Sequence, residues 1–329
     1  MIIIENKTSF LNIKNSFEFN NLALKIFNYQ YENCKVYRSF CDLLNINCSD
    51  IKTSKEIPFL PIDFFKSNQV KSFKGNSEKV FLSSTTSNNI ASKHYVKSLN
   101  NYNRTFLKCF NKFYGKESNY VILALLPSYL ERKDSSLIYM MEYLIKKTKN
   151  ELSGFYLDNY DDLIKNLETL ERKNQKTILI GVSFALINLI KYKKFKLKNT
   201  IIMETGGMKG RQNEITKKEL HQLIYDGFGV KKVHSEYGMT ELMSQAYSKE
   251  KGVFHSPPWM NIQIRSTDDP FESIGYEKVG GINIIDLANI DSCSFIATQD
   301  LGKKFRNGGF ELIGRFDNSD IRGCNLLIN

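Results

Sequence analysis

The chain has 329 residues, of which 42% are hydrophobic and 25% charged, a composition typical of an ordinary folded protein. This length suffices for one large domain or two smaller ones, each with its own core. The formal net charge is +11, but the lysines are scattered as single residues and pairs, and no stretch alternates basic and aromatic residues. We therefore expect no nucleic-acid binding, and instead an anionic small molecule or an acidic protein as the partner.

The six cysteines show no Cys-x-x-Cys spacing, which argues against a zinc site. Cys34, Cys41 and Cys48 are spaced seven residues apart, so we predict that they share one buried face of a helix. The N-terminus lacks the basic and apolar regions of a signal peptide, and the longest apolar run, 178–190, is too short to cross a bilayer. We expect a cytoplasmic protein without a membrane span.

The first predicted element is helical, because apolar residues recur at helical spacing over 16–47. Pro58 and Pro61 then favour extended backbone and mark the entry to the main domain. We accordingly divide the chain into a helical N-terminal segment over 1–55 and an α/β core with the nucleotide-binding motifs over 56–252. From about residue 253 strands and glycine-rich turns dominate, which predicts a β-rich subdomain over 253–329.

Within the core, strand patterns alternate with helix patterns. The sequence predicts strands over 120–126, 177–181 and 200–203, and helices from Asp134 onward and over 161–170. A further helix begins with a capping box at Thr216 and Glu219, and Gly227 is the predicted residue just after its end. Strands separated by helices indicate an α/β fold with a layered, mainly parallel sheet.

One segment, 234–241, carries the strongest functional signal. Tyr237 supplies an aromatic ring that could stack on a base, and Gly238 permits close approach of a ligand. Thr240 could donate a hydrogen bond to a phosphate oxygen, and Glu241 could bind a hard cation such as Mg²⁺. Alone, the pattern is weak, and a plain turn between a strand and a helix explains it equally well.

Four other segments support a nucleotide site. They are 81–88, rich in hydroxyls and followed by Lys93; 298–301, which contains Asp300; 314–317, which contains Arg315; and 320–323, just before Cys324. In order and rough spacing, the whole series resembles the motifs of the adenylate-forming superfamily. Within it the chain is most similar to the acyl-protein synthetases of fatty-acid reductase systems, with phenylacetate–CoA ligases as near relatives. The resemblance covers roughly residues 55–325.

This resemblance implies the layered, mainly parallel sheets of the adenylate-forming N-terminal domain with a β-rich subdomain. Most or all of the C-terminal domain is expected to be lacking, because the sequence stops six residues after Gly323. The domain that would normally follow supplies a lysine to the carboxylate and the α-phosphate. Another cation (Lys93, Lys209 or Lys303) or a partner subunit would then replace it, or the activity would be weak or absent.

The resemblance also assigns ATP and Mg²⁺ as cofactors. The residues implied to bind the nucleotide are Ser83, Ser84 and Thr86 at the phosphates, Gly206 and Gly207 at the adenine, Tyr237, Gly238 and Thr240 in the central motif, Asp300 at the ribose, and Arg315 at phosphate or ribose. Glu241 is the implied metal ligand. The phosphate loop departs from the family pattern, because 83–88 keeps the hydroxyls and loses both glycines. A plain Ser/Thr-rich turn at 83–88 and a flexible turn at 206–207 are the alternatives.

The reaction that the resemblance implies is the activation of a carboxylic acid, expected to be a fatty acid, followed by transfer of the acyl group to a thiol. Thr240, Lys93 and Cys324 are the catalytic candidates, with Cys324 as the acyl carrier; an inert, buried Cys324 is the alternative. The implied partners are an acyl-reductase or an acyl-carrier protein. Two alternatives stay open: an aryl- or acyl-CoA ligase with free CoA as acceptor, and a non-catalytic subunit that retains the fold.

Overall fold

A computed structural model describes residues 8–84, 90–126, 134–157, 159–206 and 216–316. Three of the predicted site residues, Thr86, Gly207 and Cys324, lie outside these ranges. The helices are α1 (Ser16–Asn33), α2 (Lys35–Leu43), α3 (Phe64–Ser67), α4 (Leu99–Tyr114), α5 (Ser136–Thr148), α6 (Tyr160–Arg172), α7 (Ser183–Tyr192) and α8 (Lys217–Phe228), with short 3₁₀ turns at Ser9–Asn12 and Glu117–Asn119.

The strands are listed here in chain order: β1 (Leu60–Pro61), β2 (Lys79–Leu82), β3 (Lys93–Val96), β4 (Val121–Leu125), β5 (Gly154–Phe155), β6 (Thr177–Val182), β7 (Thr200–Thr205), β8 (Val233–Tyr237), β9 (Ala246–Ser248), β10 (Val253–His255), β11 (Met260–Arg265), β12 (Ser273–Ile274), β13 (Val279–Asp286), β14 (Phe295–Lys304) and β15 (Phe310–Arg315). Among the described residues, β2 and β3 form a separate hairpin, and the other thirteen strands form one sheet.

The large sheet has a parallel part and an antiparallel part. Its order is β12-β11-β13-β14-β15-β10-β9-β8-β7-β6-β4-β5, with β1 paired to β14. Strands β5, β4, β6, β7 and β8 pair in parallel. From β8 the sheet continues through antiparallel pairs to β12. The predicted α/β class with a parallel core is confirmed, and the antiparallel strands provide the second wall of the candidate site.

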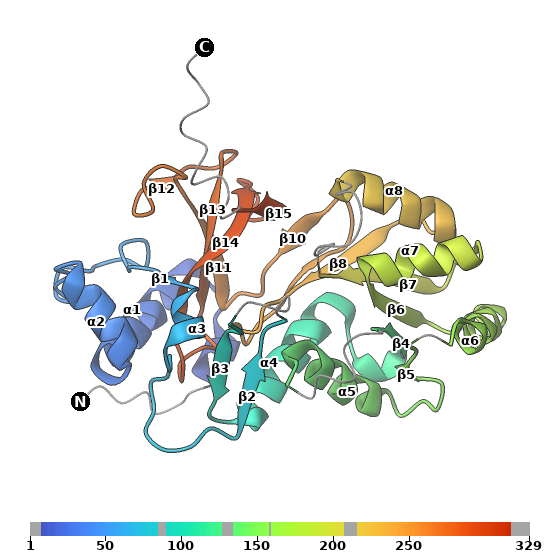
Figure 1. Cartoon of the computed structure of the whole chain (residues 1–329), viewed down its shortest axis with the longest axis horizontal. Helices are drawn as coiled ribbons and strands as arrows, with labels where there is room; N and C mark the ends of the chain where they lie inside the picture. Colours follow the sequence, from blue (N-terminus) through green and yellow to red (C-terminus); the bar gives the residue numbers. More distant parts are fainter. Residues whose placement is uncertain (1–7, 85–89, 127–133, 158, 207–215, 317–329) are drawn as a thin grey trace, which may run out of the picture.

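Helices cover both faces of the parallel strands. Figure 1 shows α4 and α5 on one face and α7 and α8 on the other. Every residue of β4 and of β6 is buried, which explains their continuous apolar sequences, since a parallel strand between two helix layers has no face in contact with water. The predicted strands and helices of this core all occur, with small shifts at their ends.

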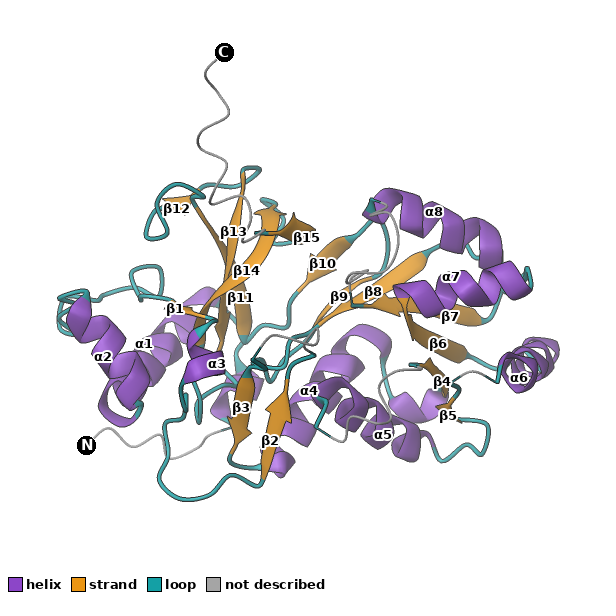
Figure 2. Ribbon diagram, in the orientation of Figure 1, coloured by secondary structure: helices purple, strands orange, loops and turns teal. Residues whose placement is uncertain are grey.

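The N-terminal helices α1 and α2 pack beside the antiparallel strands (Figure 2). The helical prediction for 16–47 is confirmed up to Leu43, with a break at Cys34, whose backbone is extended. Cys34 and Cys41 are buried, but Cys48 lies beyond the end of α2 and is partly exposed. The prediction that these three cysteines share one helical face is therefore wrong, because the chain turns at Cys34 and leaves the helix before Cys48.

Helix α8 begins where it was predicted to begin and ends later. The Thr216 and Glu219 capping box is present. The residue after the helix, however, is Gly229, which has the left-handed φ of 62°, and Gly227 is buried inside α8. A β-carbon on Gly227 would lie 2.6 Å from Cγ2 of Ile190 on α7. The two helices therefore pack closely at Gly227, and the prediction that Gly227 is the residue just after the end of α8 is wrong.

No helix in the described part of the chain is long and apolar enough to cross a membrane.

Candidate nucleotide site

The central motif lies where two parallel strands end. Strand β7 ends at Thr205 and β8 ends at Tyr237, and Thr205 pairs with Glu236 in the register of the two strands. Ligands of open α/β sheets collect at the carboxyl ends of parallel strands. Gly206 and Gly238 follow directly, so these two of the three predicted glycines lie at this edge. Gly206 is exposed and has a φ of 72°, a backbone conformation that favours glycine.

Tyr237 is joined to the antiparallel part of the sheet through Asp300. The Tyr237 hydroxyl donates a hydrogen bond to Oδ2 of Asp300 over 2.7 Å, and Nε of Arg315 donates to Oδ1 over 3.0 Å. Strands β14 and β15 place Asp300 and Arg315 opposite each other. Three residues that lie up to 78 positions apart in the sequence, Tyr237 to Arg315, therefore form one contiguous polar cluster.

The ring of Tyr237 is largely enclosed by other aromatic rings. Phe254 and Phe310 pack against it edge to face, with centroids 6.0 and 5.9 Å away, and only 8% of the residue is exposed. Burial and the neighbouring Asp300 carboxylate raise the pKa of Tyr237 well above its ordinary value. Tyr237 thus remains a neutral hydrogen-bond donor, and it fixes the orientation of Asp300.

Glu241 is a buried carboxyl group beside this cluster. It is 4% exposed, and burial raises its pKa, while a hydrogen bond with Ser92 and the charge of Arg315 act in the opposite direction. The amide of Ser92 donates to Oγ of Ser83 over 2.9 Å. The start of the hydroxyl-rich loop is therefore connected through Ser92 to Glu241, as expected if both segments contribute to one site.

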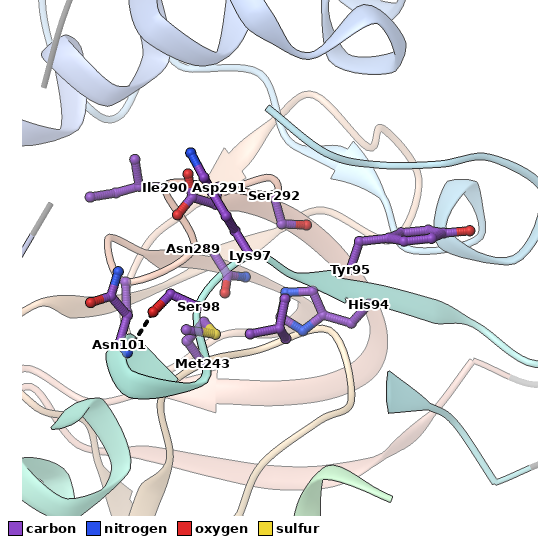
Figure 3. Close-up of a pocket in the computed structure, with 12 residues that line it drawn as sticks. His94, Tyr95, Lys97, Ser98, Asn101, Met243, Asn289, Ile290, Asp291 and Ser292 are labelled. Atoms are coloured by element: carbon purple, nitrogen blue, oxygen red, sulfur yellow. Dashed lines mark hydrogen bonds between the residues drawn. The ribbon is translucent and has the colours of Figure 1, made fainter. Parts of the chain in front are cut away.

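Two buried side chains hold the backbone of the motif from behind. Nδ1 of His94 lies 2.7 Å from the carbonyl oxygen of Thr240, and Nδ2 of Asn289 donates to the carbonyl oxygen of Glu241 over 2.7 Å. Both side chains line a small hollow together with Met243 (Figure 3). Burial lowers the pKa of His94 to about 4, so the ring is neutral near pH 7 and must donate its Nδ1 proton to Thr240.

The loop after the motif depends on Asp286, which is fully buried at the end of β13. Its carboxylate accepts from the amides of Met243 and Ser244 over 3.0 and 2.9 Å, and from the Ser244 hydroxyl over 2.8 Å. The Ser244 hydroxyl in turn accepts from Nε1 of Trp259 over 2.9 Å. These bonds fix the path of the chain directly after Glu241.

Sequence reasoning missed Arg265, which binds β14 at Thr298, and the hydroxyl of Thr298 accepts a hydrogen bond from the Asp300 amide. Its guanidinium donates to Oδ1 of Asn283 over 2.7 Å and to the carbonyl oxygen of Thr298 over 2.5 Å. A β-carbon on Gly281 would lie 2.5 Å from Cζ of Arg265, so the glycine makes room for the guanidinium. The available signal was the Gly280-Gly281 pair inside a strand, a pattern that marks close approach of another group.

Glu236 was also missed, although it lies inside the motif itself. Its Oε2 accepts a hydrogen bond from Oγ1 of Thr205 over 2.5 Å. Burial raises its pKa to about 7, and the charge of Glu204 acts in the same direction. A β-carbon on Gly238 would lie 2.6 Å from Oε1 of Glu236, which gives a second reason for glycine at position 238.

The remaining predicted residues lie on other elements. Lys93 is exposed at the start of β3, where it pairs with Leu82, and Ser84 follows directly after Ser83. Lys303 lies on β14, with its Nζ 3.7 Å from Glu311. Of the further predicted positions, Thr86, Gly207, Lys209 and Cys324 fall outside the described residues.

Within the described ranges, no group of three His, Cys, Asp or Glu side chains could hold a metal ion by itself. Glu241 nevertheless fits Mg²⁺, which is commonly bound through one or two carboxylates together with substrate phosphates. Burial of Glu241 beside Asp300 disfavours its ionised carboxylate, whereas a bound cation would favour that carboxylate.

Comparison with known proteins identifies a family and a shared fold. A family model described as "Acyl-protein synthetase, LuxE" matches residues 9–329. No curated protein matches the sequence. Among solved structures, 2-hydroxyisobutyryl-CoA ligase in the postadenylation state with 2-HIB-AMP is 11% identical, with a TM-score of 0.65, and the match covers 92% of this chain and 68% of that one.

A second similar structure is ATP-bound MatB from Rhodopseudomonas palustris. It is 14% identical, with a TM-score of 0.54, and the match covers 74% of this chain and 49% of MatB. The chain therefore spans about half the length of MatB. At these identities the likeness shows a shared fold, which confirms the predicted adenylate-forming type of N-terminal domain.

Proposed function

The chain belongs to the acyl-protein synthetase family, and from this premise we propose that it activates a carboxylic acid with ATP and passes the acyl group to a thiol. The observation that carries the proposal is the cluster of Tyr237, Asp300 and Arg315 beside the buried Glu241. It combines a carboxylate for ribose hydroxyls, a guanidinium for an oxyanion and a carboxylate for a cation at one edge of the sheet.

In this proposal the nucleotide lies across the ends of β7 and β8. Gly206 and Gly207 border the adenine, and Tyr237 holds Asp300 toward the ribose hydroxyls. Each carboxylate oxygen of Asp300 already accepts one hydrogen bond and has a second lone pair to offer. Ser83, Ser84, Thr86 and Thr240 donate hydrogen bonds to the phosphates, with Arg315 at phosphate or ribose.

Glu241 would hold Mg²⁺ against the phosphates, where the ion would neutralise negative charge during the reaction. His94 and Asn289 keep the carbonyl groups of Thr240 and Glu241 in place, so the two functional side chains start from a fixed backbone.

The proposed chemistry has two steps. A carboxylate oxygen of the acid forms a bond to the α-phosphorus of ATP, and the bond from that phosphorus to the bridging oxygen breaks, which releases pyrophosphate and leaves an acyl-adenylate. A thiolate then attacks the acyl carbon, and AMP leaves with the electron pair of the broken C–O bond. We propose that Lys93 approaches the reacting groups, where its charge would stabilise the negative charge that develops at phosphorus.

The acid is proposed to carry an apolar chain, as in the fatty acids that the family resemblance implies. A small apolar hollow lies next to the central motif, between the parallel strands and helices α4 and α5, and an acyl chain could enter it only if its side chains moved. Met140, Met141 and Leu144 of α5 and Met203 of β7 line it, and Glu236 adjoins it next to Tyr237. Methionine adapts to variable apolar ligands, and apolar pockets favour such chains.

The proposed acceptor is Cys324, with a reductase or an acyl-carrier protein as the recipient after it. Free CoA is the alternative acceptor, and the family relation does not distinguish the two. A non-catalytic subunit is the other alternative, since the phosphate loop lacks both glycines of the family pattern.

Pyrophosphate exchange into ATP, screened over carboxylic acids of different length, tests the activation step. We expect exchange that depends on acid and Mg²⁺, and a loss of at least about a hundredfold in Glu241→Gln, because the metal-binding charge is removed. Glu250→Gln is the matched control, since Glu250 is exposed and pairs with Lys232 just before the start of β8, whereas Glu241 follows the other end of that strand. Absence of exchange with every acid would favour the non-catalytic alternative.

A further inference from the structure

The fold gathers lysines that are scattered along the sequence. Four connections meet at one edge of the sheet: 173–176 before β6, 193–199 before β7, 229–232 before β8, and 249–252 between β9 and β10. They hold ten lysines and one acidic residue among nineteen residues, so they carry nine of the eleven formal net positive charges of the chain. The connections into β4 and β5, by contrast, hold one lysine and one glutamate each. We call the four connections the lysine edge.

Strand pairing places these four connections next to one another. The first residues of β6 and β7, Thr177 and Thr200, pair with each other, and Val233 at the start of β8 pairs with β7. Strand β9 runs antiparallel to β8, so the turn that follows β9 comes to the same edge. Nζ of Lys232 lies 2.8 Å from the carboxylate of Glu250, which joins two of the connections directly. Neighbouring strands are about 4.8 Å apart, so the charges lie along a strip roughly 20 Å long.

Most of these lysines face solvent without an opposite charge. Nine of them are exposed, and Lys193 is partly exposed. Within the described part of the chain, only Lys193 and Lys232 of the ten form ion pairs, with Glu168 and Glu250. The lysine edge therefore presents a strong positive charge to the surroundings.

The requirements of the fold explain only a part of this charge. Lysines at the end of a helix are favoured by its last carbonyl groups, and Lys173 and Lys193 directly follow α6 and α7. Helices α6, α7 and α8 lie at the same end of the molecule (Figure 1). The helix effect fades beyond the last turn, however, and Lys249 and Lys251 lie between two strands. Repulsion among so many like charges opposes folding, so stability does not account for their accumulation.

The other residues of the lysine edge indicate which kind of anion it fits. Its apolar side chains, Phe195, Leu197 and Val230, are all buried. These nineteen described residues thus expose no aromatic ring to stack on a base and no apolar group to enter a bilayer. They also include no arginine, the side chain that binds phosphate groups through two parallel hydrogen bonds. Carboxylates on a protein surface need neither feature, because single lysines pair with them.

We infer that the lysine edge is a docking surface for a protein whose own surface is rich in Asp and Glu. Strands β6 and β7 have six residues each, so the lysine edge lies roughly 20 Å from the candidate nucleotide site at their other ends. A partner bound at the lysine edge would leave that site open, and the inference does not depend on the proposed reaction. Opposite charges would speed association and make binding strongly dependent on salt.

The test uses a fluorescein-labelled poly-L-glutamate peptide as the acidic polypeptide. Its binding to the full chain is measured by fluorescence anisotropy at increasing NaCl concentration. The edge variant changes one exposed lysine in each connection: Lys176→Gln, Lys196→Gln, Lys231→Gln and Lys251→Gln. The matched control makes the same change of charge at exposed lysines elsewhere: Lys14→Gln, Lys25→Gln, Lys35→Gln and Lys74→Gln.

We expect the peptide to bind at least about tenfold more weakly to the edge variant, with a smaller salt dependence, because four neighbouring charges are lost. The control should bind within about twofold of the unmodified protein, since its charges lie elsewhere. Both variants should retain the thermal unfolding and the pyrophosphate exchange of the unmodified protein. Absence of exchange in all three proteins would therefore count against the proposed function and leave the docking surface intact.

Equal weakening in the two variants would show attraction to the charge of the whole protein and would overturn the inference. Duplex DNA and phosphatidylglycerol vesicles are tested with the same three proteins. A loss in the edge variant that is larger for either of these than for the peptide would assign the lysine edge to a nucleic acid or a membrane instead. If the edge variant does not fold, acetylation of the unmodified protein decides: bound peptide should protect the lysine edge, and even protection of all lysines would contradict the inference.

Discussion

His94 is a residue whose function in the site follows from its burial. Only 2% of it is exposed, and its neutral ring holds the carbonyl oxygen of Thr240. Burial is the main reason that the pKa of His94 falls to about 4, so protonation of the buried ring lowers the stability of the folded protein. Protonation of His94 is therefore coupled to the position of the backbone at Thr240, in the central motif.

The folded pKa of His94 lies below its ordinary value of 6.5, so its contribution to stability is present above pH 6.5 and is lost as the pH falls toward 4. We expect the free energy of unfolding to contain a term of roughly 1.4 kcal/mol per pH unit in this range. Urea unfolding of His94→Asn between pH 7 and pH 4.5 should show a shallower slope than the unmodified protein. His255→Asn, at an exposed position on β10, should keep the original slope; equal slopes in all three proteins would contradict the prediction.

At the scale of elements, α8 packs closely against α7 through Gly227. Gly227 permits this contact, because Ile190 of α7 fills the space that a side chain would need. The helix itself is well defined by its capping box at Thr216 and its left-handed Gly229. Helix formation and helix packing therefore depend on different residues of the same element.

Gly227→Ala should lower the free energy of unfolding by about 1–3 kcal/mol, because the new methyl group overlaps Ile190, although alanine favours helix formation. Thermal or urea unfolding measures this change. Ile190→Ala creates space for the methyl group, so the double variant should be more stable than the sum of the two single changes predicts. Additive effects would show that the two side chains do not compete for the same space.

At the scale of the whole molecule, the candidate site is formed by two parts of one sheet. The parallel part supplies Tyr237 and Glu241 at strand ends, and the antiparallel part supplies Asp300 and Arg315. Neither part contains a complete set of groups for a nucleotide. Ligand binding should therefore depend on the continuous hydrogen bonding of the sheet from β8 to β15.

The acyl acceptor is a further question at this scale. With radioactive fatty acid, ATP and Mg²⁺, we expect label on the protein that hydroxylamine removes and that Cys324→Ser loses, since a thioester needs the thiol at this position. The matched control is Cys48→Ser, which changes the partly exposed cysteine near α2 and should retain the label. Label on added CoA alone would instead support the ligase alternative.

The sequence alone determined the class of the fold, and it singled out the segment 234–241 as the candidate nucleotide motif. Buried strands such as β4 and β6 and amphipathic helices such as α5 are local patterns, because their periodicity follows from which faces meet water. The motif at 234–241 and the acidic and basic residues near 300 and 315 could be recognised from residue type and order. These features do not depend on which distant residue they contact.

The tertiary structure decided the features that depend on contacts between distant segments. The role of Gly227 required knowledge that Ile190 approaches it, and the separation of Cys48 from Cys34 required the turn between α1 and α2. The raised pKa of Glu236 could not be foreseen before the structure showed that this carboxyl group is buried, adjoins a small apolar hollow and lies near Glu204. A carboxyl group acquires such a property from burial and from its neighbours, and a linear sequence specifies neither.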